Sequence, residues 1–308
     1  MADVIHDDVV EQILIRLDVN DLIRFKTVCK SWHSLITSPG FINRHLNHSY
    51  NKDHYNNQLA HRKITLFERS GFGHRLVGSS NGLVCIFSNS IHLRVTNPLT
   101  REVRQLESPR LIGVLQLCWG FGYDSSRDDY KVVIGTKKGE NQTCFEVLSL
   151  KSNVWRVIGE VKYTFITKAG ILCNGALHWI VKDQNNKKLI ISYDLSKDEF
   201  KEIPLPVNAI CRRLGVIKNC LCIFGYYSVD NVWLMKKYNV KESWELLPRE
   251  RDREMKNDIV HLLRPRLPKD DDASWFCRPI EHLYWEYMDA PIFVQSLVSP
   301  HIKNRGSW

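Results

Sequence analysis

The feature that most restricts the fold is a strand-turn-strand pattern that recurs four times after residue 76. Each copy contains the end of an apolar strand, a polar turn, and a second strand that opens on an apolar or aromatic residue. The copies are VTNPLTREVRQL, VLSLKSNVWRVI, ISYDLSKDEFKEI and KKYNVKESWELL. Aligned on Val103, Trp155, Phe200 and Trp244, they lie 52, 45 and 44 residues apart. Such periods are typical of propeller blades, which must stack to bury both faces of each sheet.

Turn signals separate the strands of this repeat. Asn81-Gly82, Asn174-Gly175 and Lys218-Asn219 each precede apolar residues and predict two-residue hairpins, because asparagine and glycine tolerate a left-handed backbone. A fifth repeat would place its aromatic residue near 289, but prolines and the run KDDD interrupt residues 249–290. We therefore expect a propeller-like body over 71–300, irregular over 249–290, with a tail over 301–308. The sequence leaves open whether this body is complete at its C-terminal end.

The first 48 residues have a helical period instead, which indicates a separate domain. One helix is expected after a cap at Asp8, with Glu11 in a capping box, and the next is expected to begin at Leu22 after a cap at Asn20 or Asp21. Their apolar faces consist of Val10, Ile13, Leu14, Leu17, Leu22, Phe25, Val28, Cys29, Trp32, Leu35 and Ile36. The apolar face over residues 22–36 is too wide for a lone helix, so it packs on the rest of the chain or receives another protein.

A break and a linker follow these helices. Pro39 and Gly40 are expected to interrupt the chain before a last short turn. The polar residues 49–70 are expected to form a linker. The histidines in this part of the chain are predicted to be solvated loop residues rather than metal ligands: His45, His48, His54 and His61. Together the two parts predict an α+β protein by domain, with a small helical domain followed by an all-β body.

The composition excludes several classes of protein. The chain has 308 residues, of which 44% are hydrophobic and 25% charged, as in ordinary globular proteins. Its apolar runs, such as LVCIF, are far shorter than the ~20 residues of a membrane helix, and its N-terminus is acidic, unlike a signal peptide. We therefore expect no membrane association and a location in the cytosol or nucleus, with free thiols for the nine cysteines. The charge of +9 is dispersed among acidic residues, which argues against nucleic acid.

Motifs that resemble catalytic sites lack the required context. GSSNG at 78–82 matches a nucleophile elbow with Ser80 as nucleophile, but an elbow requires a strand-to-helix turn and a strand is expected here. Cys173 and His178 lie in one predicted hairpin and are five positions apart, which a strand of period two would place on opposite faces. GFGHRL and GFGYDS lack the third glycine of a dinucleotide loop. We therefore expect no catalytic residues, no metal and no cofactor.

The motif RFKTVCKSW at 24–32 and its surroundings resemble the F-box of a large group of plant proteins. The segments SSNGLVCI, NPLTREVRQL, FGYDSSRDDYKVV, NGALHWIV, YDLSKDEFKEIPLP and VQSLVSP resemble the kelch-like F-box associated interaction domain of the same group. S-locus F-box proteins and defence-regulating F-box proteins share this layout. The resemblance covers nearly the whole chain apart from about residues 249–290.

The resemblance implies a non-enzymatic substrate receptor of an SCF-type E3 ubiquitin ligase. The F-box at 1–48 would dock on a Skp-type adaptor, and through it on a cullin scaffold, while the β body would bind an unknown protein target for ubiquitination and degradation. The residues expected to contact the adaptor are Ile5, Leu14, Leu17, Leu22 and Trp32. Phe25, Val28 and Leu35 are expected to pack inward. The polar turns at 125–129, 137–142 and 182–188 are predicted to carry target binding, since loops on a rigid scaffold vary freely.

The sequence departs from the family pattern at three places. Ile5-His6 replaces its Leu-Pro, Asp18 replaces a proline, and Asn20-Asp21 replaces Lys-Ser. These changes leave adaptor affinity open. The alternative is a propeller-type binding scaffold, or a degenerate F-box protein, that is not coupled to ubiquitination. A third hypothesis, nucleic-acid binding, is favoured by the net charge alone.

Overall fold

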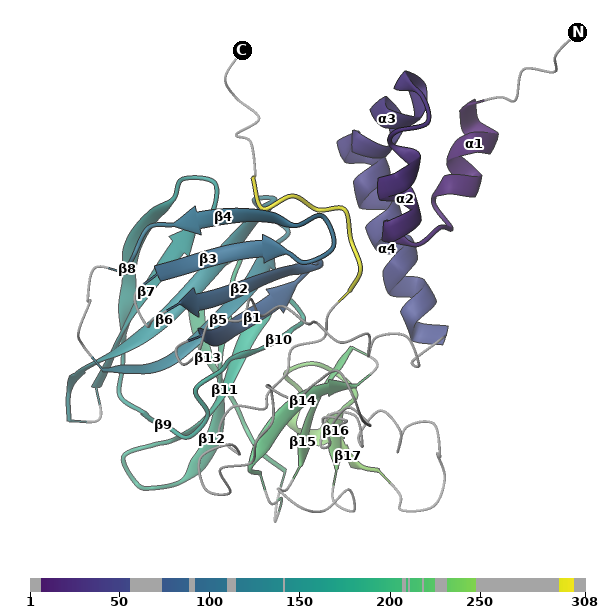
Figure 1. Cartoon of the computed structure of the whole chain (residues 1–308). Helices are drawn as coiled ribbons and strands as arrows, with labels where there is room; N and C mark the ends of the chain where they lie inside the picture. The colour runs from purple at the N-terminus through teal and green to yellow at the C-terminus, as the bar shows by residue number, and fades with distance from the viewer. Residues whose placement is uncertain are drawn as a thin grey trace, which may run out of the picture. The chain divides into compact units, whose positions relative to one another are not determined.

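The computed structural model describes residues 7–55, 74–88, 92–109, 115–140, 142–206, 209, 211–217, 219–224, 232–247 and 294–301. The chain divides into two compact units, Met1–Ser108 with Ile292–Trp308, and Pro109–Pro291. The first unit holds four helices, one sheet and a C-terminal segment, and the second holds three sheets (Figure 1). Among the helices in the described ranges, none is long and apolar enough to cross a membrane.

The N-terminal helices are α1 (Asp7–Leu14), α2 (Val19–Phe25), α3 (Lys30–Thr37) and α4 (Pro39–Tyr55). Helix α2 begins three residues earlier than predicted, because Asp18 is its N-cap and the Asp18 carbonyl accepts bonds from the amides of Asp21 and Leu22, both at 3.1 Å. The predicted caps at Asn20 and Asp21 are therefore wrong. The predicted capping role of Glu11 is not observed either, since its carboxylate forms an ion pair with Arg44 of α4.

Helix α4 corrects the prediction of a break at Pro39. Ser38 caps the helix, with its Oγ accepting a hydrogen bond from the Phe41 amide at 3.2 Å. Pro39 fits the first helical position because no intrahelical bond needs its missing N–H there. The helix continues to Tyr55, so residues 49–55 are helical rather than linker. His45 is a buried residue of this helix and not a solvated loop residue, since its Nε2 lies 2.9 Å from the Leu17 carbonyl oxygen.

The described β strands form four antiparallel sheets in which neighbouring strands follow chain order, except that β9 pairs with β11 in the third sheet. The sheet of the first unit consists of β1 (His74–Ser80), β2 (Leu83–Ser88), β3 (His92–Asn97) and β4 (Glu102–Leu106). The next consists of β5 (Gln116–Asp124), β6 (Asp129–Gly139), β7 (Gln142–Ser149) and β8 (Val154–Val161). The third consists of β9 (Thr164–Phe165), β10 (Ile171–Cys173), β11 (Ala176–Lys182), β12 (Lys188–Asp194) and β13 (Glu199–Ile203). The last consists of β14 (Arg213–Ile217), β15 (Cys220–Phe224), β16 (Trp233–Met235) and β17 (Trp244–Leu246), with a 3-10 turn at Lys241–Ser243.

The sequence repeat coincides with this architecture. Its four anchor residues Val103, Trp155, Phe200 and Trp244 lie on β4, β8, β13 and β17, the last strand of each sheet. The repeat therefore identified one blade-like sheet per copy, as predicted. Residues 249–290 and 302–308, where an irregular region and a tail are predicted, lie outside the described residues.

Left-handed turn residues also repeat from sheet to sheet. Along the four-stranded path of each sheet, which is β10–β13 in the third, the first turn has a residue with φ between 49° and 60°: Asn81, Asp128, Asn174 and Asn219. The third turn has one with φ between 53° and 60°: Arg101, Asn153, Asp198 and Asn239. Short Asn and Asp side chains tolerate this conformation well. The predicted hairpins at Asn81-Gly82 and Asn174-Gly175 are confirmed, with Gly82 and Gly175 at φ 78° and 72°.

The sheets of the second unit bury their apolar faces against one another. One core lies between β5–β8 and β9–β13 and includes Phe145, Trp179 and Tyr193. The Trp179 indole N–H donates to the Trp119 carbonyl at 3.2 Å. A second core lies between β9–β13 and β14–β17 and includes Trp244. Stacking of this kind is what a repeat of small sheets requires, because no single sheet covers its own faces.

Candidate functional site

The four helices enclose a small apolar core that decides which side chains a partner can reach. Five helical residues are buried in it: Leu14, Val19, Leu22, Ile36 and Phe41. Partly buried residues pack around them, including Leu17, Phe25, Trp32 and Leu35. Trp32 and Phe25 meet edge to face with their ring centroids 5.5 Å apart. The helical segment therefore has a core of its own, to which most of the predicted apolar face contributes.

This core changes the set of adaptor-binding residues. Leu14 and Leu22 are fully buried inside the chain, so the prediction that they contact an adaptor is wrong: a partner cannot reach them without opening the core. Leu17 and Trp32 retain part of their exposed surface, and their role stays a prediction. Ile5 lies outside the described residues.

Three exposed apolar residues are better placed than Leu14 and Leu22 to contact an adaptor. Val9 and Ile13 of α1 and Val28 after α2 are 50%, 56% and 59% exposed. Val28 was expected to pack inward, and this expectation is wrong. Ile13 was assigned to the same apolar face as Leu14, but it lies outside the core that buries Leu14. Val9 and Ile13 are four residues apart and therefore lie on one side of α1, whereas Leu14 faces the core. The sequence did contain a sign of this exposed face: the adjacent apolar pairs Val9-Val10 and Ile13-Leu14. A helix with one buried face needs only one apolar residue of each pair for its core, so the other is left for a second contact.

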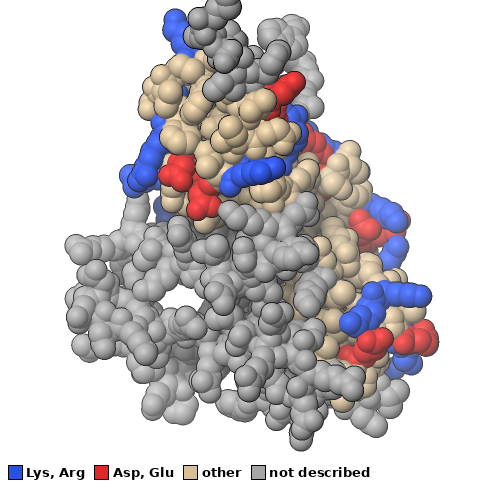
Figure 2. All heavy atoms as spheres, turned by 90° about the vertical axis from the view of Figure 1, so that its right-hand side faces the viewer, with Lys and Arg blue, Asp and Glu red and all other residues tan. Residues whose placement is uncertain are grey.

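On the face drawn in Figure 2, the described charged side chains do not favour a polyanionic partner. Figure 2 shows Lys and Arg interspersed with Asp and Glu over the described part of the face that it presents. Binding through phosphate contacts requires Lys and Arg gathered on one surface. The mixture of signs in this view is that of an ordinary solvated protein surface.

The predicted target loop at 125–129 is attached to the neighbouring sheet. Arg127 forms ion pairs with Asp124 at 2.9 Å and Asp198 at 3.8 Å. Lys131 is buried, with its Nζ 3.0 Å from Asp124 and 2.9 Å from Asp198. Burial alone would raise the pKa of Asp124, but hydrogen bonds from Ser126, Arg127, Lys131 and Ser196 outweigh it and hold the pKa well below its usual range. This turn therefore joins two sheets. Residues 125–128 are exposed, and their role in target binding stays a prediction.

The other two predicted loops lie at one end of their sheets. Strand β6 runs from Asp129 to Gly139, so the β6–β7 turn lies at the opposite end from 125–128. At this end Glu160 of β8 contacts Lys138 and Gln142. Glu160 also lines a pocket with residues 183–185 of the β11–β12 turn. The structure therefore brings 137–142 and 182–188 to a common face.

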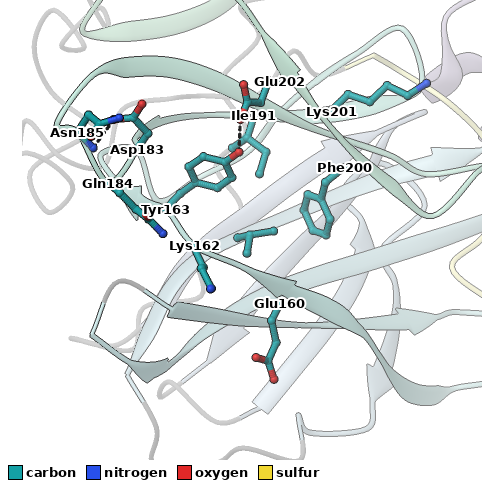
Figure 3. A pocket seen from close by; sticks show the side chains of 11 residues that line it. Glu160, Lys162, Tyr163, Asp183, Gln184, Asn185, Ile191, Phe200, Lys201 and Glu202 are labelled. Carbon is teal, nitrogen blue, oxygen red and sulfur yellow. Dashed lines mark hydrogen bonds between the residues drawn. The ribbon is translucent and has the colours of Figure 1, made fainter.

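A pocket of about 490 Å³ lies on this face (Figure 3). Apolar side chains line part of it: Val161, Ile191 and Phe200. Tyr163 donates a hydrogen bond to Glu202, and burial, together with the charges of Glu202 and Asp183, raises the pKa of Tyr163 to about 12. The Asp183 carboxylate accepts bonds from the amides of Asn185 and Lys187, both at 2.8 Å, which fixes the β11–β12 turn. No sequence pattern indicated this pocket, because its residues come from four separate segments.

The residues that resembled catalytic motifs are placed as structural residues. Ser80 ends β1 and leads through Asn81-Gly82 into β2, so the strand-to-helix turn of a nucleophile elbow is absent at this position. Cys173 Sγ lies 3.6 Å from the Asn219 carbonyl oxygen, and burial raises the pKa of this thiol to about 12. His178 contacts the Ile171 carbonyl at 3.0 Å and the Tyr238 hydroxyl at 2.8 Å. Both ring nitrogens thus have partners other than Cys173.

Comparison with protein families identifies both parts of the chain. Residues 5–44 match the F-box domain, and residues 47–276 match the F-box associated beta propeller domain. An F-box/kelch-repeat protein of Arabidopsis thaliana is 31% identical over 284 residues, which cover 78% of each chain. Another F-box protein of that plant is 29% identical, covering 77% of this chain and 70% of the relative.

The F-box protein CPR1 of Arabidopsis thaliana is 28% identical over 77% of this chain and 70% of its own. Among solved structures, the WD40 domain of SCAP from fission yeast aligns with a TM-score of 0.34 at 10% identity, over 56% of this chain and 42% of that chain. A similarity at this level adds no argument. The two domain matches and the relatives at this coverage establish that the chain belongs to the F-box proteins with a C-terminal F-box associated beta propeller domain.

Proposed function

We propose that the chain is the substrate-recognition subunit of an SCF-type E3 ubiquitin ligase, acting in the cytosol or nucleus. Its F-box would dock on a Skp-type adaptor and through it on a cullin scaffold. Its β body would hold a target protein for ubiquitination and degradation. One observation carries the proposal: F-box helices that leave Val9, Ile13 and Val28 exposed occur in one chain with a body of blade-like sheets. Exposed apolar side chains of this kind are suited to contact with a partner protein.

The chain would supply proximity rather than chemistry. Holding a target beside the charged conjugating enzyme raises the effective concentration of its lysines, which accelerates transfer without any catalytic group from the receptor. This role requires two surfaces, one for the adaptor and one for the target.

The adaptor surface can be tested by titrating the full chain with a purified Skp-type adaptor in a calorimeter. Ile13→Asp places a charge in the proposed contact and should weaken binding at least about tenfold, since a buried charge without a partner is costly. Val157→Asp is the matched control, because Val157 of β8 is 57% exposed and Ile13 is 56% exposed. The control should bind as the unmodified chain does. Equal affinities for both variants would place the adaptor elsewhere, and no binding by the unmodified chain would reject the proposal.

For the target surface we propose the face that carries the turns 137–142 and 182–188 and the pocket between them. The supporting observations are the exposure of residues 184–188 and the apolar lining of the pocket, since binding sites commonly pair an apolar floor with a few fixed polar groups. Tyr163, Asp183 and Glu202 would provide those polar groups.

Charge reversal at the two ends of the third sheet tests this assignment. Lys162→Glu changes the pocket rim, whereas Lys197→Glu changes the β12–β13 turn at the opposite end of β12. Both lysines are exposed, so both variants should fold. Proteins that co-purify from native tissue with the unmodified chain and with Lys197→Glu, but not with Lys162→Glu, would support the face. If these proteins were lost only with Lys197→Glu, target binding would lie at the end of the sheet that carries the β12–β13 turn.

The second candidate function is a binding scaffold that is not coupled to ubiquitination. The family departures His6 and Asp18 favour it, because both replace prolines in the F-box. The adaptor titration decides between the two functions: a chain that retains its tissue partners but does not bind the adaptor is a scaffold.

A further inference from the structure

The C-terminal segment at residues 294–301 contacts both the helices and the sheet of the first unit. It has no regular secondary structure, yet four of its eight residues are buried: Val294, Ser296, Leu297 and Pro300. Figure 1 shows the segment in yellow beside the sheet β1–β4 and the helices, where it hydrogen-bonds to Asn97 and packs Leu297 into the helical core. Its partners lie about two hundred residues earlier in the chain. Buried backbone groups that are not paired in a β-sheet must form hydrogen bonds with other groups.

The sheet provides those hydrogen bonds. Asn97, at the end of β3, is fully buried, and its Nδ2 donates to the carbonyls of Ser296 at 2.9 Å and Val298 at 2.8 Å. Ser296 Oγ in turn donates to the Asn81 carbonyl at 2.5 Å and accepts from the Val298 amide at 3.2 Å. The segment is therefore fixed to the turns that end β1 and β3.

Gly82 shows how closely the segment approaches the sheet. A Cβ atom at this position would lie 2.6 Å from the Val294 carbonyl oxygen and 2.4 Å from Ser296 Oγ. Both separations are shorter than real Cβ contacts, and φ at Gly82 is +78°, which also favours glycine. The Asn-Gly pair thus serves the hairpin and leaves room for the C-terminal segment.

The other side of the segment belongs to the helical core. Leu297 is 3% exposed and is buried with Leu14, Val19, Leu22, Ile36 and Phe41. Leu99, from the turn after β3, packs against the same cluster. The hydroxyl of Tyr50 on α4 donates to Asn81 Oδ1 at 2.9 Å. A helical segment of about 50 residues is close to the lower size limit for a stable core, so one added leucine is a large share of its burial.

We propose that residues 294–301 act as an intramolecular strap that completes the F-box core with Leu297 and fastens the F-box helices to the sheet β1–β4. The F-box is then not an independent module at the start of the chain. Its stability depends on a leucine near the C-terminus, and its orientation to β1–β4 is fixed by Asn97 and Ser296. The strap itself does not depend on the proposed ligase function; its consequence for ubiquitin transfer does, because a fixed adaptor end restricts where a bound target is presented.

Hydrogen exchange of the full chain, without adaptor, tests the strap. Leu297→Ala should raise amide exchange in α1–α3 at least about tenfold, since removing a buried leucine leaves a cavity in the core it completes, while β5–β8 should be unchanged. Leu221→Ala is the matched control: Leu221 of β15 is also buried but belongs to the core of the other unit. It should raise exchange in β14–β17 and leave α1–α3 unchanged.

Two milder variants keep the test informative if Leu297→Ala fails to fold. Gly82→Ala should loosen the strap from the sheet and raise exchange at residues 294–301 several-fold. Leu297→Met, which preserves volume, should restore protection of α1–α3 to within about threefold. Unchanged exchange in α1–α3 with Leu297→Ala would overturn the proposal. Because the measurement requires no adaptor, a chain that fails to bind the adaptor would reject the proposed function without deciding about the strap.

Discussion

Two joints in this chain differ in whether they bury charge. The joint between β5–β8 and β9–β13 adds buried ion pairs to an apolar core: the ammonium of Lys131 lies between Asp124 and Asp198, at 3.0 and 2.9 Å. The contacts that join α1–α4 to β1–β4 through the strap are uncharged: Leu297 lies in the helical core, and Asn97 bonds the strap backbone. A buried ion pair is costly to break but gains little over an apolar contact. An apolar joint loses stability gradually as volume is removed. The two joints should therefore respond differently to substitution and to acid.

The largest effect is expected from breaking the buried ion pairs of the first joint. Lys131 is 3% exposed, and Lys131→Ala removes the buried cation between two carboxylates, which then share only the half-exposed Arg127, so we expect a loss of about 3–5 kcal/mol in the free energy of unfolding. Lys138, which is 56% exposed in its pair with Glu160, provides the control, and Lys138→Ala should not change stability measurably. Urea denaturation measures both. Similar losses in the free energy of unfolding for the two variants would show that burial does not make the Lys131 ion pairs more important than an exposed pair.

Acid should weaken the second unit before the F-box helices. Burial lowers the pKa of His178 from 6.5 to about 4, so between these values the unfolded chain binds a proton that the folded chain does not. Stability is therefore full above pH 6.5 and falls as the pH drops toward 4, by up to about 3 kcal/mol at ~1.36 kcal/mol per pKa unit. Hydrogen exchange at pH 7 and pH 5 should show the loss in β10–β17. His178→Gln should remove most of this pH dependence; an unchanged profile would reject His178 as its source.

The hydrogen bonds of the strap should contribute less than the ion pair. Asn97→Ala leaves the carbonyls of Ser296 and Val298 without their donor, and we expect a loss of about 1–3 kcal/mol, measured by thermal unfolding. Asp194→Ala is the matched control, because the Oδ1 of Asp194 at the end of β12 accepts bonds from two amides of the following turn, as the Oδ1 of Asn97 does; it shows how much of the loss comes from the turn itself. If both variants lose the same amount, the contacts with the strap add nothing.

The smallest effect is expected at a family departure. Asp18 has φ −71° at the N-cap of α2, which a proline ring accommodates, so Asp18→Pro should stabilise the F-box by about 0.4–1 kcal/mol through the unfolded chain. With His6→Pro added, adaptor binding should tighten. Weaker binding by the double variant, with stability retained, would show that this chain is adapted to His6 and Asp18.

Local features of the fold could be predicted from the sequence because they repeat. Trp155, Phe200 and Trp244 mark the last strands of three sheets, since each copy of the motif meets the same packing requirement. The hairpins at Asn81-Gly82 and Asn174-Gly175 followed from backbone sterics alone. The length of α4 did not, because Pro39 was interpreted as a break when it occupies the first helical position after a Ser38 cap.

The candidate sites were less predictable because they depend on distant contacts. A helical period shows that Ile13 and Leu14 lie near an apolar face, but the core that buries Leu14 and exposes Ile13 requires the packing of α1 against the other helices. The turn at 125–129 was predicted as an exposed polar loop, and residues 125–128 are exposed, but the pairing of Arg127 with Asp198, about seventy residues later, could not be predicted. The segment VQSLVSP was recognised only by its resemblance to the F-box associated domain, which did not indicate that Leu297 enters the helical core. The partners of Leu297 are separated from it by nearly the whole chain, and no repeat relates them.

The most direct test of the account is hydrogen exchange of the full chain with and without a saturating Skp-type adaptor. Adaptor bound to the F-box should protect α1–α3, and because coupling between packed elements is reciprocal, it should also protect the strap at 294–301. The target face at 160–163 and 183–188 should be unaffected. Protection confined to the β body, or no protection anywhere, would contradict the assignment of the F-box as the adaptor end. Protection of α1–α3 without any change at 294–301 would contradict their coupling through Leu297.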